Sequence, residues 1–190
     1  MVAGVIALAV VALAFGLGAI PFGVVLARRH GVDPREHGSG NIGATNVTRI
    51  LGPRVGLIVL ALDAAKGALS IVIATRWCGQ SWPIAAAGFA AILGHCFSPF
   101  LGWKGGKGVA TGFGVFLVLV PQLAALAVLA FVAVWRLTGV PALGSLAGTV
   151  AMAAILIARG DTPEATLACA TCALLFFTHR SNLAKLTRAR

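Results

Sequence analysis

Long uninterrupted apolar runs constrain the fold of this chain more than any other feature. The runs Val2–Ala27, Val55–Thr75 and Trp82–Leu101 each provide the roughly 20 residues that a helix needs to cross a bilayer. The chain is 59% hydrophobic and only 11% charged. Apolar and polar side chains do not alternate, which disfavours a transmembrane barrel, and helices pair their own backbone groups in lipid. The sequence therefore predicts an all-α integral membrane protein with one polytopic domain over residues 1–190. The first run has no basic segment before it, so it is expected to be retained as a helix.

The number of crossings depends on residues 109–135, an apolar stretch interrupted by Pro121. At about 1.5 Å per residue this stretch is too long for one upright helix, so it is either one kinked helix or two short ones. A single crossing divides the basic residues outside the spans almost evenly between the two sides. A turn near Pro121 leaves only Arg76 and Arg159 on the outer side. The positive-inside rule therefore favours seven transmembrane helices, with the N-terminus outside and the C-terminus cytoplasmic.

In the seven-helix arrangement the polar segments all reach the cytoplasmic face. They are residues 28–53, 102–108 and 136–144 and the basic tail His179–Arg190. We expect an active site at that face, open to both water and lipid. The net charge of +10 then serves topology and contact with anionic lipid or substrate, and no nucleic-acid partner is expected.

Asp63, Lys66 and His95 lie within the expected spans. Asp63 and Lys66 are three residues apart on one helix face, so they are expected to neutralise each other inside the bundle. His95 is interpreted as a hydrogen-bonded core histidine rather than a ligand. The cysteines, including the closely spaced Cys169 and Cys172, lie in apolar surroundings without a metal-binding pattern, so no metal or cofactor is expected.

A glycine-rich basic segment lies between two of the apolar runs. In Lys104-Gly105-Gly106-Lys107-Gly108 the backbone N–H groups are free of side chains that would block them, and two lysines add positive charge. Such a loop can bind phosphate. It is not a nucleotide P-loop, because Leu101 and Gly108 occupy positions that require Gly and Ser or Thr. The alternative is an ordinary basic cytoplasmic turn.

Three further polar groupings are candidates for binding. Residues 39–49, Ser-Gly-Asn-Ile-Gly-Ala-Thr-Asn-Val-Thr-Arg, combine glycines and hydrogen-bonding side chains with Arg49, which can grip a phosphate with two parallel bonds. Ser145 enters a helix and is alternatively only a cap. His179 and Asn182 share a helix face near the basic terminus, which is common without function.

Together these segments resemble the bacterial PlsY-type acyl-phosphate-dependent glycerol-3-phosphate acyltransferases. The similar segments are residues 39–49, Gly94–Thr111, Gly144-Ser145, His179–Leu186 and the Asp63-to-Gly67 pattern, in the family's order along nearly the whole chain. The resemblance implies a seven-helix membrane enzyme without cofactor. It implies transfer of a fatty acyl group from acyl phosphate to the sn-1 hydroxyl of glycerol 3-phosphate, giving lysophosphatidic acid and phosphate.

The resemblance also implies roles for individual residues. Around glycerol 3-phosphate it puts a catalytic set of Ser39, Arg49, Lys107, Ser145, His179 and Asn182. Around the acyl phosphate it puts Thr45, Asn46 and the Gly105–Gly108 turn. The full substrate-binding set expected here is Asn41, Gly43, Thr45, Asn46, Lys104, Gly105, Gly106, Gly108 and Thr111.

The resemblance further implies a bacterial inner-membrane location, contact with membrane lipid and a possible partnership with the enzyme that forms acyl phosphate. An acyl-CoA-dependent transferase is disfavoured, because no histidine of the chain has an acidic residue five positions later. A transporter of a phosphorylated solute, with Asp63 and Lys66 lining its pathway, is the alternative from another functional class. It requires a route to the outer face, where the loops are short and poor in polar ligands.

Overall fold

The computed structural model describes residues 1–188, which form helices and connecting loops without a strand. Arg190, counted above in the basic tail, lies outside the described residues. The helices are α1 (Val2–Ala19), α2 (Phe22–Arg29), α3 (Ala44–Leu51), α4 (Pro53–Cys78), α5 (Ser81–Cys96), a short 3-10 turn (Pro99–Leu101), α6 (Val109–Leu119), α7 (Pro121–Thr138), α8 (Pro141–Arg159) and α9 (Thr162–Arg188). The expected all-α class is confirmed.

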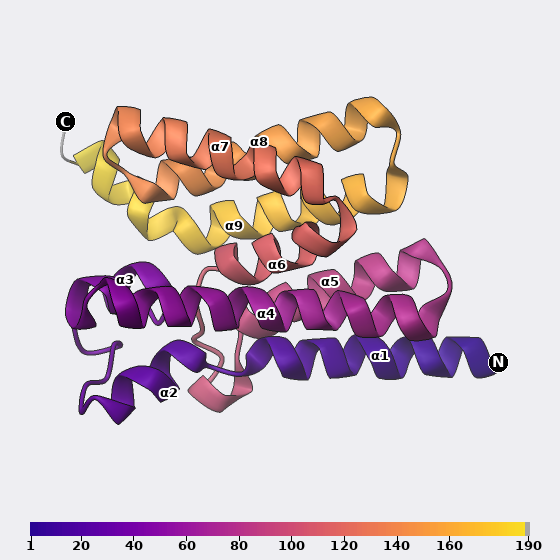
Figure 1. Ribbon diagram of the computed structural model, residues 1–190, viewed down its shortest axis with the longest axis horizontal. Coiled ribbons are helices and arrows are strands. Elements are labelled where there is room, and N and C mark those ends of the chain that lie inside the picture. Colours follow the sequence, from indigo (N-terminus) through magenta and orange to yellow (C-terminus); the bar gives the residue numbers. More distant parts are fainter. Residues whose placement is uncertain (189–190) are drawn as a thin grey trace.

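The long helices run side by side in two layers (Figure 1). One layer contains α1 to α5, with α1 packed on α5 and α4. The other contains α7, α8 and α9, and α6 joins the layers by packing on α4. The N-terminus lies at one end of the long axis, and α2, α3 and the C-terminal part of α9 lie at the opposite end. Several of the polar segments thus share one end of the bundle.

Two helix breaks lie directly before proline residues. The first apolar run divides at Ile20, whose extended backbone (φ −60°, ψ 119°) separates α1 from α2 just before Pro21. The second break lies at Val120, and α7 begins at Pro121. Figure 1 shows the chain reversing direction there, so α6 and α7 are two helices rather than one. Proline causes both breaks because it cannot donate a backbone hydrogen bond and clashes with the preceding turn.

Five helical segments in the described chain are long and apolar enough to cross a membrane. They are Val2–Arg29, Pro53–Cys78, Ser81–Leu101, Pro121–Thr138 and Pro141–Arg159. The 11 residues of α6 extend only about 16 Å, which is less than the roughly 30 Å of a hydrocarbon core. The chain is therefore a multi-pass membrane protein, and the seven-helix count and the orientation of the termini stay predictions.

Glycines allow α4 and α6 to touch backbone to backbone. A Cβ atom at Gly114 of α6 would clash with the carbonyl oxygen of Ala64, and one at Gly67 of α4 would clash with that of Thr111. Membrane helices associate through such close contacts, because lipid supplies no hydrophobic force between them. This contact fixes α6, and thereby the glycine-rich loop that precedes it, against the first layer.

Candidate functional site

The glycine-rich loop is built on the last turn of α5. The backbone N–H groups of Gly105 and Gly106 donate to the carbonyls of Cys96 and His95, at 3.0 and 2.9 Å. A Cβ at Gly105 would clash with the His95 carbonyl. Glycine is thus needed because the loop backbone lies directly on another backbone.

The loop ends at the N-terminus of α6. Gly108 has a left-handed backbone (φ +87°) and precedes the first helical residue, Val109. The first N–H groups of a helix have no partner within it and carry partial positive charge, which suits an anion. Lys107 adds a full charge beside this helix end.

Lys107 is tied to α9 by two hydrogen bonds. Its half-buried ammonium donates to the Asn182 side-chain oxygen, and the Thr178 hydroxyl donates to its backbone carbonyl at 3.1 Å. His179 lies between these two α9 residues and is 2% exposed. Its Nδ1 is 2.8 Å from the Leu175 carbonyl. Because a carbonyl only accepts, Nδ1 carries the proton and Nε2 of the neutral ring is an acceptor.

Positive charge surrounds Lys107. Burial, followed by the charges of Lys185 and Arg49, holds the pKa of Lys107 below its usual range. Among residues 1–186 no ion pair involves any of these three cations. Such a cluster of uncompensated charge favours an anionic ligand.

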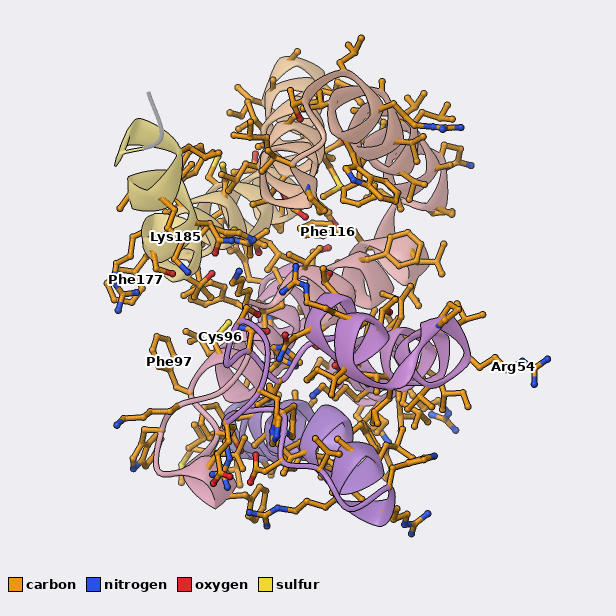
Figure 2. The ribbon with its side chains drawn as sticks, turned by 90° about the vertical axis from the view of Figure 1, so that its left-hand side faces the viewer. Arg54, Cys96, Phe97, Phe116, Phe177 and Lys185 are labelled. Carbon is orange, nitrogen blue, oxygen red and sulfur yellow. The ribbon has the colours of Figure 1, made fainter. Side chains whose placement is uncertain are left out.

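Figure 2 looks onto this end of the molecule. Lys185 and Phe177 of α9 lie on the same side of this view as Cys96, the last residue of α5, and Phe97, which follows it, whereas Arg54 points outward on the opposite side. The rings of Phe97 and Phe177 are 6.5 Å apart between centroids. The end of α5 and the second half of α9 are thus held together next to the cationic cluster of Lys107, Lys185 and Arg49.

The 28–53 segment is organised by Asn46, which is only 1% exposed. Its amide nitrogen lies within 3.0 Å of the carbonyls of Pro34, His37 and Asn41, and its oxygen accepts from the Ser39 N–H at 2.8 Å. The amide is fully engaged, so Asn46 supports the loop rather than facing a ligand. Ser39, Thr45 and Arg49 are exposed around it.

Asn41 and Gly43 support the start of α3. The Asn41 side-chain oxygen accepts from the Gly43 N–H at 2.9 Å, directly before α3. This local bond closes an Asx turn, in which an Asn side chain bonds the backbone two residues on. The two residues therefore shape the segment that carries Thr45 and Arg49.

Other expected site residues are less closely associated with Lys107. The Ser145 hydroxyl donates to the Pro141 carbonyl of its own helix at 3.1 Å. Thr111 is 0% exposed and lies in the α4–α6 contact described above, while Lys104 is exposed. The structure groups Arg49, Lys107 and Asn182, and His179 lies one helical turn before Asn182 on α9.

Sequence reasoning missed three contributors. Thr178 and Lys185 act on Lys107, as described; Thr178 directly precedes His179, and Lys185 lies within the segment His179–Leu186. Asp33 receives hydrogen bonds from Arg35 and Arg28 at 2.6 and 2.9 Å. The Arg35 bonds hold the pKa of Asp33 well below its usual range. The clustering of Arg and Asp in residues 28–35 was the available signal.

Comparisons with known proteins agree on one family. A family model described as glycerol-3-phosphate acyltransferase matches residues 8–189. A protein of that name from Myxococcus xanthus (strain DK1622) is 48% identical over 95% of both chains. Another, from Anaeromyxobacter dehalogenans (strain 2CP-C), is 46% identical over 94% of this chain and 92% of its own.

Two solved structures are also similar to the chain. One is a crystal structure of PlsY (YgiH), an integral membrane glycerol 3-phosphate acyltransferase, in its glycerol 3-phosphate form. It matches with a TM-score of 0.92 and 38% identity, over 97% of this chain and 93% of the other. The lysophosphatidic acid form of the same protein matches with a TM-score of 0.90.

Proposed function

Because the chain belongs to the glycerol-3-phosphate acyltransferase family, we propose that it transfers a fatty acyl group from acyl phosphate to the sn-1 hydroxyl of glycerol 3-phosphate. The products are lysophosphatidic acid and inorganic phosphate. The observation that carries this proposal is the position of Lys107 at the start of α6, bonded to Asn182 and flanked by the charges of Arg49 and Lys185. Two phosphorylated substrates need such a concentration of positive charge.

The acceptor is bound by polar side chains of the 39–49 segment, the glycine-rich loop, α8 and α9. Arg49 and Lys107 bind the phosphate of glycerol 3-phosphate through charge-assisted hydrogen bonds. His179, Asn182, Ser39 and Ser145 complete this site by contacting the glycerol hydroxyls and phosphate. The similar PlsY structure in its glycerol 3-phosphate form supports this acceptor.

The donor phosphate lies beside the Gly105–Gly108 turn, on the N–H groups of Gly108 and of the first residues of α6, with Thr45 and Lys104 adding polar groups and charge. The N–H groups of Gly105 and Gly106 are bonded to the end of α5, so these two glycines shape the turn. We assign Asn41, Gly43, Asn46 and Thr111 to positioning, because their polar groups or backbones hold loops and helices in place. The acyl chain extends into lipid, since the site is at the end of membrane helices.

The reaction needs no covalent enzyme intermediate, because acyl phosphate is already an activated mixed anhydride. The sn-1 oxygen attacks the acyl carbonyl carbon, and the bond between that carbon and the phosphate oxygen breaks. The hydroxyl proton passes to the departing phosphate, directly or through Nε2 of His179. Lys107 and the N–H groups at the start of α6 hold the two phosphates together and stabilise the developing oxyanion, so catalysis comes from positioning and charge.

The enzyme is placed in a bacterial inner membrane with seven crossings, the N-terminus outside and the C-terminus cytoplasmic. Residues 1–190 form one domain whose site faces the cytoplasm, where glycerol 3-phosphate is soluble. The short α6 and the long α9 supply the two crossings that are needed in addition to the five apolar segments. An acyl-phosphate-forming enzyme is the expected supplier of donor.

The test is phosphate release by the purified protein with glycerol 3-phosphate and either palmitoyl phosphate or palmitoyl-CoA. We expect phosphate and lysophosphatidic acid from palmitoyl phosphate alone. Glycerol without its phosphate should fail as acceptor, which checks the role of the cationic cluster. Folded protein that is inactive with both donors would contradict the proposal, and activity only with palmitoyl-CoA would contradict the donor.

A further inference from the structure

A line of buried ionisable groups runs from the end of α1 to the glycine-rich loop. Asp63, Lys66 and His95 are 2%, 4% and 4% exposed, and the reaction described above uses none of them. The Lys66 ammonium lies 2.9 Å from Asp63 Oδ1, as the sequence predicts. The same oxygen lies 3.6 Å from Nδ1 of His95.

Lys66 fixes one end of this line. Its ammonium donates to the Ile20 carbonyl at 2.7 Å, at the break between α1 and α2. It also lies 5.8 Å from the centre of the Phe22 ring. The Ile20 carbonyl also accepts from the Phe22 N–H at 3.2 Å, so Lys66 is held at the point where the two helices separate.

His95 forms the other end. A Cβ at Gly106 would clash with Nε2 of the His95 ring, so the loop backbone lies directly against the imidazole. The Gly106 N–H donates to the His95 carbonyl at 2.9 Å. Nδ1 is buried without a hydrogen bond, in contrast to the hydrogen-bonded histidine expected from sequence. The Asp63 carboxylate, 3.6 Å away, is the ionisable partner that faces this nitrogen.

The energetic argument favours a role beyond stability. Moving charges out of water costs several kcal/mol, and apolar residues of similar size often stabilise a fold as well as a buried ion pair does. The close α4–α6 backbone contact already holds these layers together. The line ends on Gly106, the residue before Lys107, so it is in contact with the phosphate-binding loop.

We propose that Asp63, Lys66 and His95 are positioning residues for the phosphate-binding loop. Asp63 orients the His95 ring, the ring supports Gly106, and Gly106 sets the position of Lys107. None of the three touches substrate. The inference rests on the proposed function in that phosphate binding at Lys107 is its readout.

Kinetics of conservative variants test this role. In Asp63→Asn and His95→Gln we expect kcat/KM for glycerol 3-phosphate to fall about tenfold to a hundredfold, mainly through a raised KM, because small displacements of a binding group are costly. Ser70→Ala is the matched control. Ser70 is buried on α4 and its hydroxyl bonds only the Lys66 carbonyl of its own helix, so its KM should stay unchanged.

A double-mutant cycle tests the ring-to-loop contact directly. Gly106→Ala puts a methyl group onto the imidazole and should displace the loop, while His95→Ala removes the support and makes room for that methyl. The double variant should therefore be at least as active as the less active of the two single variants. Losses that multiply would show that the two sites act independently and would overturn the contact.

Binding of inorganic phosphate separates this inference from the proposed function. Phosphate should raise the unfolding temperature of the wild-type chain and of Ser70→Ala, and this rise should be smaller in His95→Gln. The measurement needs no acyl transfer, so an inactive wild-type protein would count against the function alone. Unchanged KM values and an unchanged phosphate response in both folded variants would overturn the positioning role.

Discussion

Lys107 combines three interactions that arise from separate parts of the chain. Its ammonium bonds to Asn182, its carbonyl accepts from Thr178, and its backbone follows Gly106 on the imidazole of His95. Each interaction restricts the lysine, so its charge is held at the N-terminus of α6 rather than free in water. Pre-placed charge of this kind needs little reorganisation when a phosphate binds.

Removing either phosphate-binding cation should abolish most of the activity while leaving the fold intact. A charge-assisted hydrogen bond contributes roughly 1.5–3 kcal/mol, which corresponds to about a tenfold to hundredfold loss in kcat/KM for Lys107→Ala or Arg49→Ala. Steady-state kinetics and size-exclusion chromatography check both parts. Arg54→Ala is the control, because Arg54 points away from the site (Figure 2). Near-normal turnover in either test variant would argue against the phosphate clamp.

As the pH rises, affinity for glycerol 3-phosphate should weaken at a lower pH than it would if Lys107 had the pKa of an exposed lysine. Burial and neighbouring cations lower the pKa of Lys107 in the free protein, so its charge is lost below the pH of about 10.4 at which exposed lysines titrate. Phosphate binds the charged form, so KM for glycerol 3-phosphate should rise as pH passes upward through this lowered pKa. Lys107→Arg should remove that rise, because a guanidinium stays charged. An identical pH profile in Lys107→Arg would assign the titration to another group.

The helices are held at their mutual distances by small residues rather than by interlocking large ones. Gly67 and Gly114 allow the contact of α4 with α6, and Gly144 and Gly148 of α8 face the backbone of α7 in the same way. Because α6 starts at the phosphate-binding loop, the α4–α6 distance also determines where the loop lies. Helix packing and site geometry are therefore coupled.

A methyl group at Gly114 should separate α4 from α6. Gly114→Ala puts its Cβ onto the Ala64 carbonyl, and overpacking of this kind costs about 1–3 kcal/mol. Thermal unfolding in detergent should show a lower unfolding temperature. Gly16→Ala in α1 is the control, because no atom lies within 4 Å of the added methyl. Equal unfolding temperatures for the two variants would contradict the close contact.

The whole molecule separates an apolar body from one polar end. The N-terminus lies at one end of the bundle, while α2, α3 and the C-terminal part of α9 lie at the other (Figure 1). The cations of the site are at this second end, and the basic residues that cluster on the cytoplasmic side of membrane proteins suit it. The charge pattern that orients the protein thus also supplies charge to the site.

Labelling of single cysteines can test this orientation in intact cells. In a variant without its native cysteines, Gln80→Cys, exposed beyond α4, should react with a membrane-impermeant maleimide from outside. Glu36→Cys, exposed between α2 and α3, should react only after the cells are opened. The reverse pattern would invert the topology, and labelling of both positions in intact cells would contradict a single orientation.

Some features of this protein follow from local chemistry and could be read from the sequence. Apolar runs require helices in lipid, Pro121 interrupts the helix that precedes it, and Asp63 and Lys66 are close because helix geometry brings such neighbours together. The family and its enzymatic class were likewise recognisable from contiguous motifs, as the matched relatives confirm.

Other features depend on contacts between segments far apart in the chain. Sequence motifs could not tell that Asn46 faces the loop carbonyls, that Thr111 lies between two helices, or that Thr178 holds the Lys107 backbone. Nor could they place Gly106 on the ring of His95. A side chain's neighbours across a helix contact depend on how the whole bundle packs, whereas its helical or loop state depends mainly on nearby residues.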